Sequence, residues 1–195
     1  TAFTGLDKLD TSNVANMQTM FNGLENIQTL DLSSFNTAKV TNFRGIFGGE
    51  KKLTTLNLTG WDTSAAKDMG EMFYRCNALT TISGLSKFNT AHATDMSGMF
   101  QGCTAMTALD LSNFNTANVK TMGMMFYQCS NLETVKLTSF DTSNVTNLYA
   151  MFQYCSKLKT VDLSSFNTSA VTNMSAAFDG CHKLQEITLG KDFKF

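Results

Sequence analysis

Five cysteines are the residues of this sequence that most invite a chemical interpretation. Zinc-binding cysteines usually come in closely spaced pairs, and an odd number of cysteines cannot all form disulfides. Neighbouring repeats could bring two of their Cα atoms within disulfide range, but side chains stacked in parallel point the same way. A small buried thiol is the simpler prediction for each position. The five follow one another at steps of 26 or 27 residues: Cys76, Cys103, Cys129, Cys155 and Cys181.

The two histidines offer little support for catalysis. His92 and His182 lie 90 residues apart, and neither has an aspartate or cysteine at the spacing of a known catalytic motif. Nucleophilic catalysis needs a nucleophile and a base that lie close together in the fold, and no motif in this sequence predicts such a pair. The sequence also lacks the glycine-rich phosphate loop, the calcium-loop pattern and the Gly-x-Ser-x-Gly motif. We therefore predict no enzymatic activity, no cofactor and no metal.

Composition narrows the class of protein further. Of 195 residues, 43% are hydrophobic and 16% are charged, which is typical of a folded chain. The formal net charge of −1 argues against a nucleic-acid partner, because such partners require many phosphates to be neutralised. No apolar stretch approaches the roughly 20 residues that cross a bilayer, so we expect no membrane insertion. The repeat pattern is already running near Thr1, so we expect a piece of a longer protein whose targeting signal lies elsewhere.

An internal repeat organises the whole sequence. A phenylalanine recurs every 26 residues, with a single step of 27, at Phe21, Phe47, Phe73, Phe100, Phe126, Phe152 and Phe178. The extra residue falls in the segment Ile82 to Leu85, so we expect a bulge or a wider turn at Gly84. A fixed period of this length is typical of solenoid proteins, in which stacked units share one core.

Two hydrophobic periods coexist within each repeat. Alternation at residues 161–163, 30–32 and 109–111 predicts a short strand with its middle side chain directed outward. Further on, Met69, Met72, Phe73 and Cys76 have the i, i+3, i+4, i+7 spacing of a helix face. Asp68 stands where it could cap such a helix, and Asn147 and Asn173 hold the same position in later repeats.

A recurring Phe-Asn-Thr motif, or a variant of it, lies between these two segments, and Asn or Asp there can bond the backbone two residues on. We interpret this motif as structural, and we expect Trp61, which replaces the phenylalanine, to pack in the core. Glu50 replaces the repeated cysteine next to Gly48 and Gly49, so we expect a local distortion there.

Together, these patterns predict an α/β fold. We expect a leucine-rich-repeat-type solenoid with a parallel strand ladder on one face and short helices on the other. Residues 1–195 would form a single domain of about seven repeats, and residues 184–195 would form a capping strand at the C-terminal end.

The repeat unit resembles that of a known family. The string Leu-x-x-Leu-Asp-Leu-Ser-x-Phe-Asn-Thr-Ser-x-Val-Thr-Asn-Met-x-x-Met-Phe-x-x-Cys is similar to the 26-residue repeat of BspA-like leucine-rich bacterial surface proteins, and the similarity covers nearly the whole chain. The resemblance implies a secreted or surface-anchored protein that adheres to host cells or to matrix proteins such as fibronectin.

Two surfaces are candidates for partner binding. The first is the outward side of the predicted strand ladder, where a solenoid offers a wide, ordered platform. Its candidate residues are Thr29, Asp31, Thr55, Asn57, Asp110, Thr134, Lys136, Thr160 and Asp162. The second is an aromatic patch at non-core positions of neighbouring repeats, formed by Tyr127, Tyr149 and Tyr154.

These surfaces leave three functional hypotheses. We expect a non-enzymatic module that binds a protein or glycan on a host cell or in its matrix. A structural spacer that displays other domains is the alternative. Ice or glycan binding by the threonine row is less favoured, because Ala108 and Glu186 interrupt that row.

Overall fold

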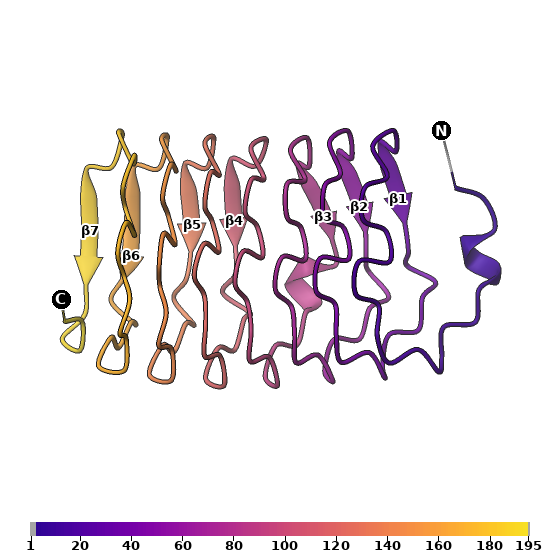
Figure 1. The fold of residues 1–195 in the computed structure, drawn as a ribbon, viewed down its shortest axis with the longest axis horizontal. Coiled ribbons are helices and arrows are strands. Elements are labelled where there is room, and N and C mark those ends of the chain that lie inside the picture. Colours follow the sequence, from indigo (N-terminus) through magenta and orange to yellow (C-terminus); the bar gives the residue numbers. More distant parts are fainter. Residues whose placement is uncertain (1–2, 195) are drawn as a thin grey trace.

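The computed structural model describes residues 3–194 and shows coils that follow one another in a single row (Figure 1). Each coil from the second onward contributes one short strand, and these strands run parallel in the same orientation. The strands form three sheets, ordered β1-β2-β3, β4-β5 and β6-β7. Their bounds are β1 Thr29–Asp31, β2 Thr55–Asn57, β3 Thr81–Ser83, β4 Ala108–Asp110, β5 Thr134–Lys136, β6 Thr160–Leu163 and β7 Glu186–Leu189.

A second ladder runs along the stack, about half a coil away in sequence from the strands. Single parallel bridges join one residue of each coil to its equivalent in the next, in the order Asn16, Asn42, Asp68, Asp95, Thr121, Asn147 and Asn173. This second ladder continues past the junction between β3 and β4, where the strand ladder is interrupted. The protein is therefore a parallel β-solenoid in which β-bridges join consecutive coils on two sides.

The predicted short helices are wrong. The segment that begins at Met69 consists of consecutive turns, and its backbone N–H groups bond to the next coil: Met69 N to Asp95 O at 3.0 Å and Phe73 N to Met99 O at 2.9 Å. Two positions of this segment, Glu71 and Arg75, have positive φ angles, which an α-helix does not allow. Asp68, Asn147 and Asn173 are therefore bridge residues and not helix caps.

The physical reason lies in the spacing between coils. Parallel strands are separated by about 4.8 Å, whereas packed helices need about 8–10 Å between their axes. Turns can follow the strand spacing on the other side of the coil, whereas helices there would force the stack to curve. The only helical segments among residues 3–194 are two short 3-10 turns, η1 at Leu6–Lys8 and η2 at Leu85–Lys87. No helix of this described part is long and apolar enough to span a bilayer.

The core was predicted correctly even where the backbone was not. Met69, Met72, Phe73 and Cys76 are all completely buried, as the apolar spacing indicated. The repeated phenylalanines stack ring on ring along the solenoid, with centroids 5.3 Å apart for Phe73 and Phe100 and nearly parallel planes. Since each ring covers the next, no coil has a separate core of its own.

The Phe-Asn-Thr motif joins each coil to the next through its threonine. The buried Thr142 hydroxyl donates to the carbonyl of Asn167 at 2.8 Å and accepts from the Asn167 N–H at 2.9 Å. Seven buried threonines occupy this position: Thr11, Thr37, Thr63, Thr90, Thr116, Thr142 and Thr168. Trp61 is buried as predicted, and its indole N–H donates to the carbonyl of Leu32 at 3.0 Å.

Both predicted irregularities are confirmed. Gly84 has a φ of 95°, and the extra residue is accommodated in η2 directly after it. A Cβ at Gly84 would lie 2.5 Å from the carbonyl oxygen of Leu58, so only glycine allows this close approach. After Glu50, residues 51 and 52 form a bend where the other coils form a hydrogen-bonded turn.

The C-terminal coil ends in β7, which pairs with β6 in register from Thr160 and Glu186 onward. Ile187 and Leu189 of β7 remain 38% and 42% exposed. The capping role of residues 184–195 stays a prediction, and residue 195 lies outside the described residues.

We predict that the threonine column carries a large share of the stability. The Thr142→Val substitution keeps the shape of the side chain but leaves the buried N–H and carbonyl of Asn167 without their partner. We expect the free energy of unfolding, measured by urea denaturation, to fall by about 2–4 kcal/mol. The matched control is Thr160→Val on the exposed side of β6, which should change it by less than about 0.5 kcal/mol. Equal effects of the two substitutions would contradict the proposed role.

Candidate functional site

The five cysteines form a buried column and not a reactive site. All are free thiols; four are buried and Cys181 is partly exposed. Each thiol lies against the backbone carbonyl of a phenylalanine in the preceding coil, as Cys129 Sγ does with Phe100 O at 3.0 Å. Burial raises the pKa of Cys129 to about 12 and that of Cys181 to about 11. A thiol with such a pKa is almost never a nucleophile at neutral pH, so the predicted structural role is confirmed.

Glu50 occupies the cysteine position of the second coil, with only 1% of its surface exposed. Its carboxylate accepts a hydrogen bond of 2.6 Å from the backbone N–H of Leu24 in the preceding coil. Burial raises the pKa of this carboxyl, and the hydrogen bonds from the Leu24 and Gly23 N–H groups only partly oppose that effect. A buried carboxyl group therefore occupies the position at which later coils have a thiol of the cysteine column.

This geometry predicts a pH-dependent contribution to stability. Because the folded pKa of Glu50 lies above its unfolded value, the folded state binds more protons between the two values. Stability from this group is therefore lost as the pH rises from about 4.5 through the folded pKa. We expect the Glu50→Gln variant to gain stability relative to the wild type over this range, measured by urea unfolding at a series of pH values.

The matched control is Glu133→Gln on the surface. Lys159 lowers the pKa of Glu133 through a hydrogen bond of 2.6 Å, so the sign is reversed. This variant should lose stability relative to the wild type as the pH rises toward about 4.5, and the difference should stay constant above that pH, where the effect of Glu50 sets in. A Glu50→Gln difference that does not change with pH would contradict the raised pKa.

The strand face consists of two outward columns on the strands. One column carries threonines, of which Thr29, Thr134 and Thr160 are exposed and Thr55 is half-buried. Within the described residues, the hydroxyls of these four make no hydrogen bond. Their outward position on the strands is as predicted, and the binding of a partner by this surface stays a prediction.

The second column of the strand face is more constrained. Asp31, Asp110 and Asp162 each accept the backbone N–H of the serine two residues on, for example Ser112 N to Asp110 Oδ1 at 3.1 Å. Asn57 holds Thr59 in the same way. Lys136 forms an ion pair with Asp110 of the preceding coil, with 2.8 Å between Nζ and Oδ2. The three aspartates and Asn57 therefore hold the turns that follow the strands.

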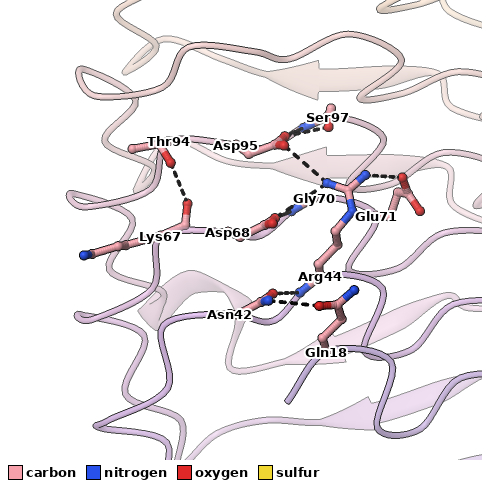
Figure 2. A network of polar contacts seen from close by, with 10 residues as sticks. All are labelled: Gln18, Asn42, Arg44, Lys67, Asp68, Gly70, Glu71, Thr94, Asp95 and Ser97. Carbon is pink, nitrogen blue, oxygen red and sulfur yellow. Dashed lines mark hydrogen bonds and ion pairs between the residues drawn. The ribbon is translucent and has the colours of Figure 1, made fainter. Parts of the chain in front are cut away.

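A charged network on the bridge side was not predicted (Figure 2). The guanidinium of Arg44 contacts three carboxylates from the next two coils: Glu71, Asp68 at 3.8 Å and Asp95 at 3.2 Å. Asp68 and Asp95 also hold the turn of their own coil, through Gly70 N and Ser97 N. One cation therefore joins three successive coils.

Charge and burial act against each other in this network. Burial lowers the pKa of the Arg44 guanidinium, but the three carboxylates outweigh burial and raise it. For Asp68, burial and the neighbouring carboxylates of Asp95 and Glu71 together raise the pKa of the carboxyl, and Arg44 and the Gly70 N–H only partly oppose them. A Cβ at Gly70 would lie 2.5 Å from Arg44 Nη1, so the missing side chain makes the room for this contact. The three carboxylates of this network are therefore already paired with Arg44.

We predict that the Arg44→Gln variant is less stable than the wild type. Three neighbouring carboxylates would lose their cation, but all are partly solvated, so we expect a loss of only about 1 kcal/mol in the free energy of unfolding. Because salt screens this repulsion, the loss should shrink in 1 M NaCl. As a control, Lys159→Gln removes a single exposed ion pair and should have almost no effect. A loss that is the same at low and high salt would contradict the electrostatic origin.

The predicted tyrosines do not form one patch. Tyr127 and Tyr154 come from consecutive coils and meet edge to face, with ring centroids 5.8 Å apart. Tyr149 is 37% exposed and makes no ring contact with them in the described part of the chain. The tyrosine pair remains a candidate contact surface, while Tyr149 stands separately.

The histidines and other metal-binding residue types do not converge. His92 is exposed and its Nδ1 contacts the carbonyl oxygen of Ser64 at 2.8 Å, while His182 lies in a distant coil. Among residues 3–194, no three His, Cys, Asp or Glu side chains are grouped in a way that could hold a metal ion.

Two solved structures have low similarity to this chain: a chain of the Toll–Spätzle complex of Drosophila, and a leucine-rich repeat protein from Bacteroides ovatus. The first has 14% identity and a TM-score of 0.35 over 87% of this chain and 27% of that one. The second has 16% identity and a TM-score of 0.32 over 88% of this chain and 63% of that one. No curated protein sequence matches the chain.

A family model gives the more informative match. The family described as "Mycoplasma protein of unknown function, DUF285" matches residues 1–108 and again residues 78–191, so together the two matches cover nearly every coil. The protein therefore belongs to the DUF285 family.

Proposed function

We propose that this protein is a non-enzymatic binding module of a bacterial cell-surface protein, which adheres to a protein or glycan of host cells or their matrix. The observation that carries the proposal is the column of threonine hydroxyls on the strand face, which lack hydrogen-bonding partners in the described chain. Many other threonines in the coils use their hydroxyls to bond a neighbouring coil, whereas these four leave theirs free for a partner.

The geometry of this column suits a partner that is itself extended. Where consecutive strands pair, as at Thr29 and Thr55, the hydroxyls lie about 4.8 Å apart on a rigid support, so little side-chain entropy is lost on binding. The resemblance of the repeats to BspA-like surface proteins supports an extracellular location and adhesion. The mixed charges of Asp31, Asp110, Lys136 and Asp162 favour no strongly charged partner.

The experiment is a binding screen of the chain against fibronectin, other matrix proteins and host-cell surfaces. We expect saturable binding to at least one of them. A strand-face variant, Thr134→Arg with Thr160→Arg, places two long cations on the exposed threonine column and should weaken that binding at least tenfold. The matched control, Met20→Arg with Asn22→Arg, alters exposed residues of the turn segment of the first coil and should bind normally.

The alternative is a structural spacer that displays other domains. Under that function, the strand-face variant would leave the activity of the intact protein unchanged. Absence of saturable binding to every probe, together with a strand-face variant that behaves as the wild type, would favour the spacer over the binding module.

A further inference from the structure

A groove of about 560 Å³ lies at the edge of the turn segments in the C-terminal half of the solenoid. Two columns of residues form its walls, and both run along the stack. One column consists of Thr104, Ser130, Ser156 and His182, each directly after a cysteine of the buried column. The other consists of Gln128, Tyr154 and Gly180.

Tyr154 has a backbone conformation that its residue type disfavours. Its φ angle is 61°, and a bulky side chain is rarely found in this region. In four other coils the equivalent position is glycine: Gly23, Gly49, Gly102 and Gly180, all with positive φ. Arg75 and Gln128 hold this position with positive φ in two further coils, so the fold accepts side chains here at some cost in backbone energy.

The ring of Tyr154 is also held in place. It meets Tyr127 of the preceding coil edge to face, and it lies over Gly180 of the next coil, where a Cβ would be only 2.4 Å from Tyr154 Cδ1. The side chain is nevertheless 43% exposed. The groove therefore presents an aromatic surface that is already ordered before any ligand arrives.

Hydrogen-bonding groups surround this ring. In the described chain, the hydroxyls of Ser130 and Tyr154, the amide of Gln128 and the imidazole of His182 make no hydrogen bond through their side chains. No carboxylate, ammonium or guanidinium is among the groove's lining residues in this described part. The groove therefore suits an uncharged ligand with many hydroxyls and an apolar face.

We propose that this groove binds a neutral saccharide. The C–H face of one sugar packs on the Tyr154 ring, and Gln128, Ser130 and His182 pair with its hydroxyls. Since both walls run along the stack, an oligosaccharide lies along the solenoid axis. This site is separate from the strand face, and the proposed function there does not depend on it.

The experiment titrates the full 195-residue chain with neutral trisaccharides of glucose, galactose, mannose and N-acetylglucosamine, followed by calorimetry. We expect saturable binding of at least one trisaccharide. The Tyr154→Gly variant removes the ring and also suits the positive φ, so it should melt at the same temperature or higher. Its affinity for that trisaccharide should fall at least tenfold.

Two further variants test the assignment. Tyr149→Ser removes an exposed tyrosine outside the groove, at a position where two other coils already have Ser97 and Ser175, and should bind as the wild type does. Ser130→Ala with His182→Ala should weaken binding several-fold. A folded Tyr154→Gly variant with unchanged affinity, or the lack of saturable binding to all four trisaccharides, would overturn the proposal, whatever the strand-face variant does in its own screen.

Discussion

The distance between neighbouring coils is the constraint on which the rest of the structure depends. Backbone hydrogen bonds fix it at about 4.8 Å on the strand face, and the parallel bridges impose the same kind of spacing on the other side. Because both sides advance equally, equivalent residues lie directly above one another. The phenylalanine rings, buried thiols and threonine hydroxyls then form continuous columns, and each coil is stabilised by its neighbours more than by its own contacts.

This constraint also explains how far the sequence could predict the fold. The 26-residue period places each side chain in its column, so burial, the strand ladder and the distortions at Gly84 and Glu50 could all be predicted. The turns that stand in place of the predicted helices could not be predicted, because consecutive four-residue turns bury the same i, i+3, i+4 and i+7 positions as a helix does. The available indication was glycine at positions that require positive φ, such as Gly98 and Gly102, which no helix interior favours.

The candidate sites also differ in how far the sequence could predict them. The strand-face threonines follow from the period alone, since alternate strand residues face outward. The Arg44 network does not, because a long side chain reaches Asp95, 51 residues further on, only through the space left by Gly70. The groove around Tyr154 was predicted only in part: its tyrosines were noticed, but its polar wall combines single residues from four coils.

In a fold built of residue columns, the polar side chains that do not bond a neighbouring coil indicate where a ligand could bind. Among the described residues, no buried side-chain nitrogen or oxygen lacks a hydrogen bond, so polar groups inside the stack are fully occupied in joining coils. Groups that remain unoccupied then lie on the surface, where the fold does not need them. Both proposed contact surfaces contain such groups, the threonine column of the strand face and the polar groups around Tyr154. The threonine column extends over many coils and suits an extended partner, whereas the set around Tyr154, which only three or four coils share, suits a ligand small enough to be contacted at once.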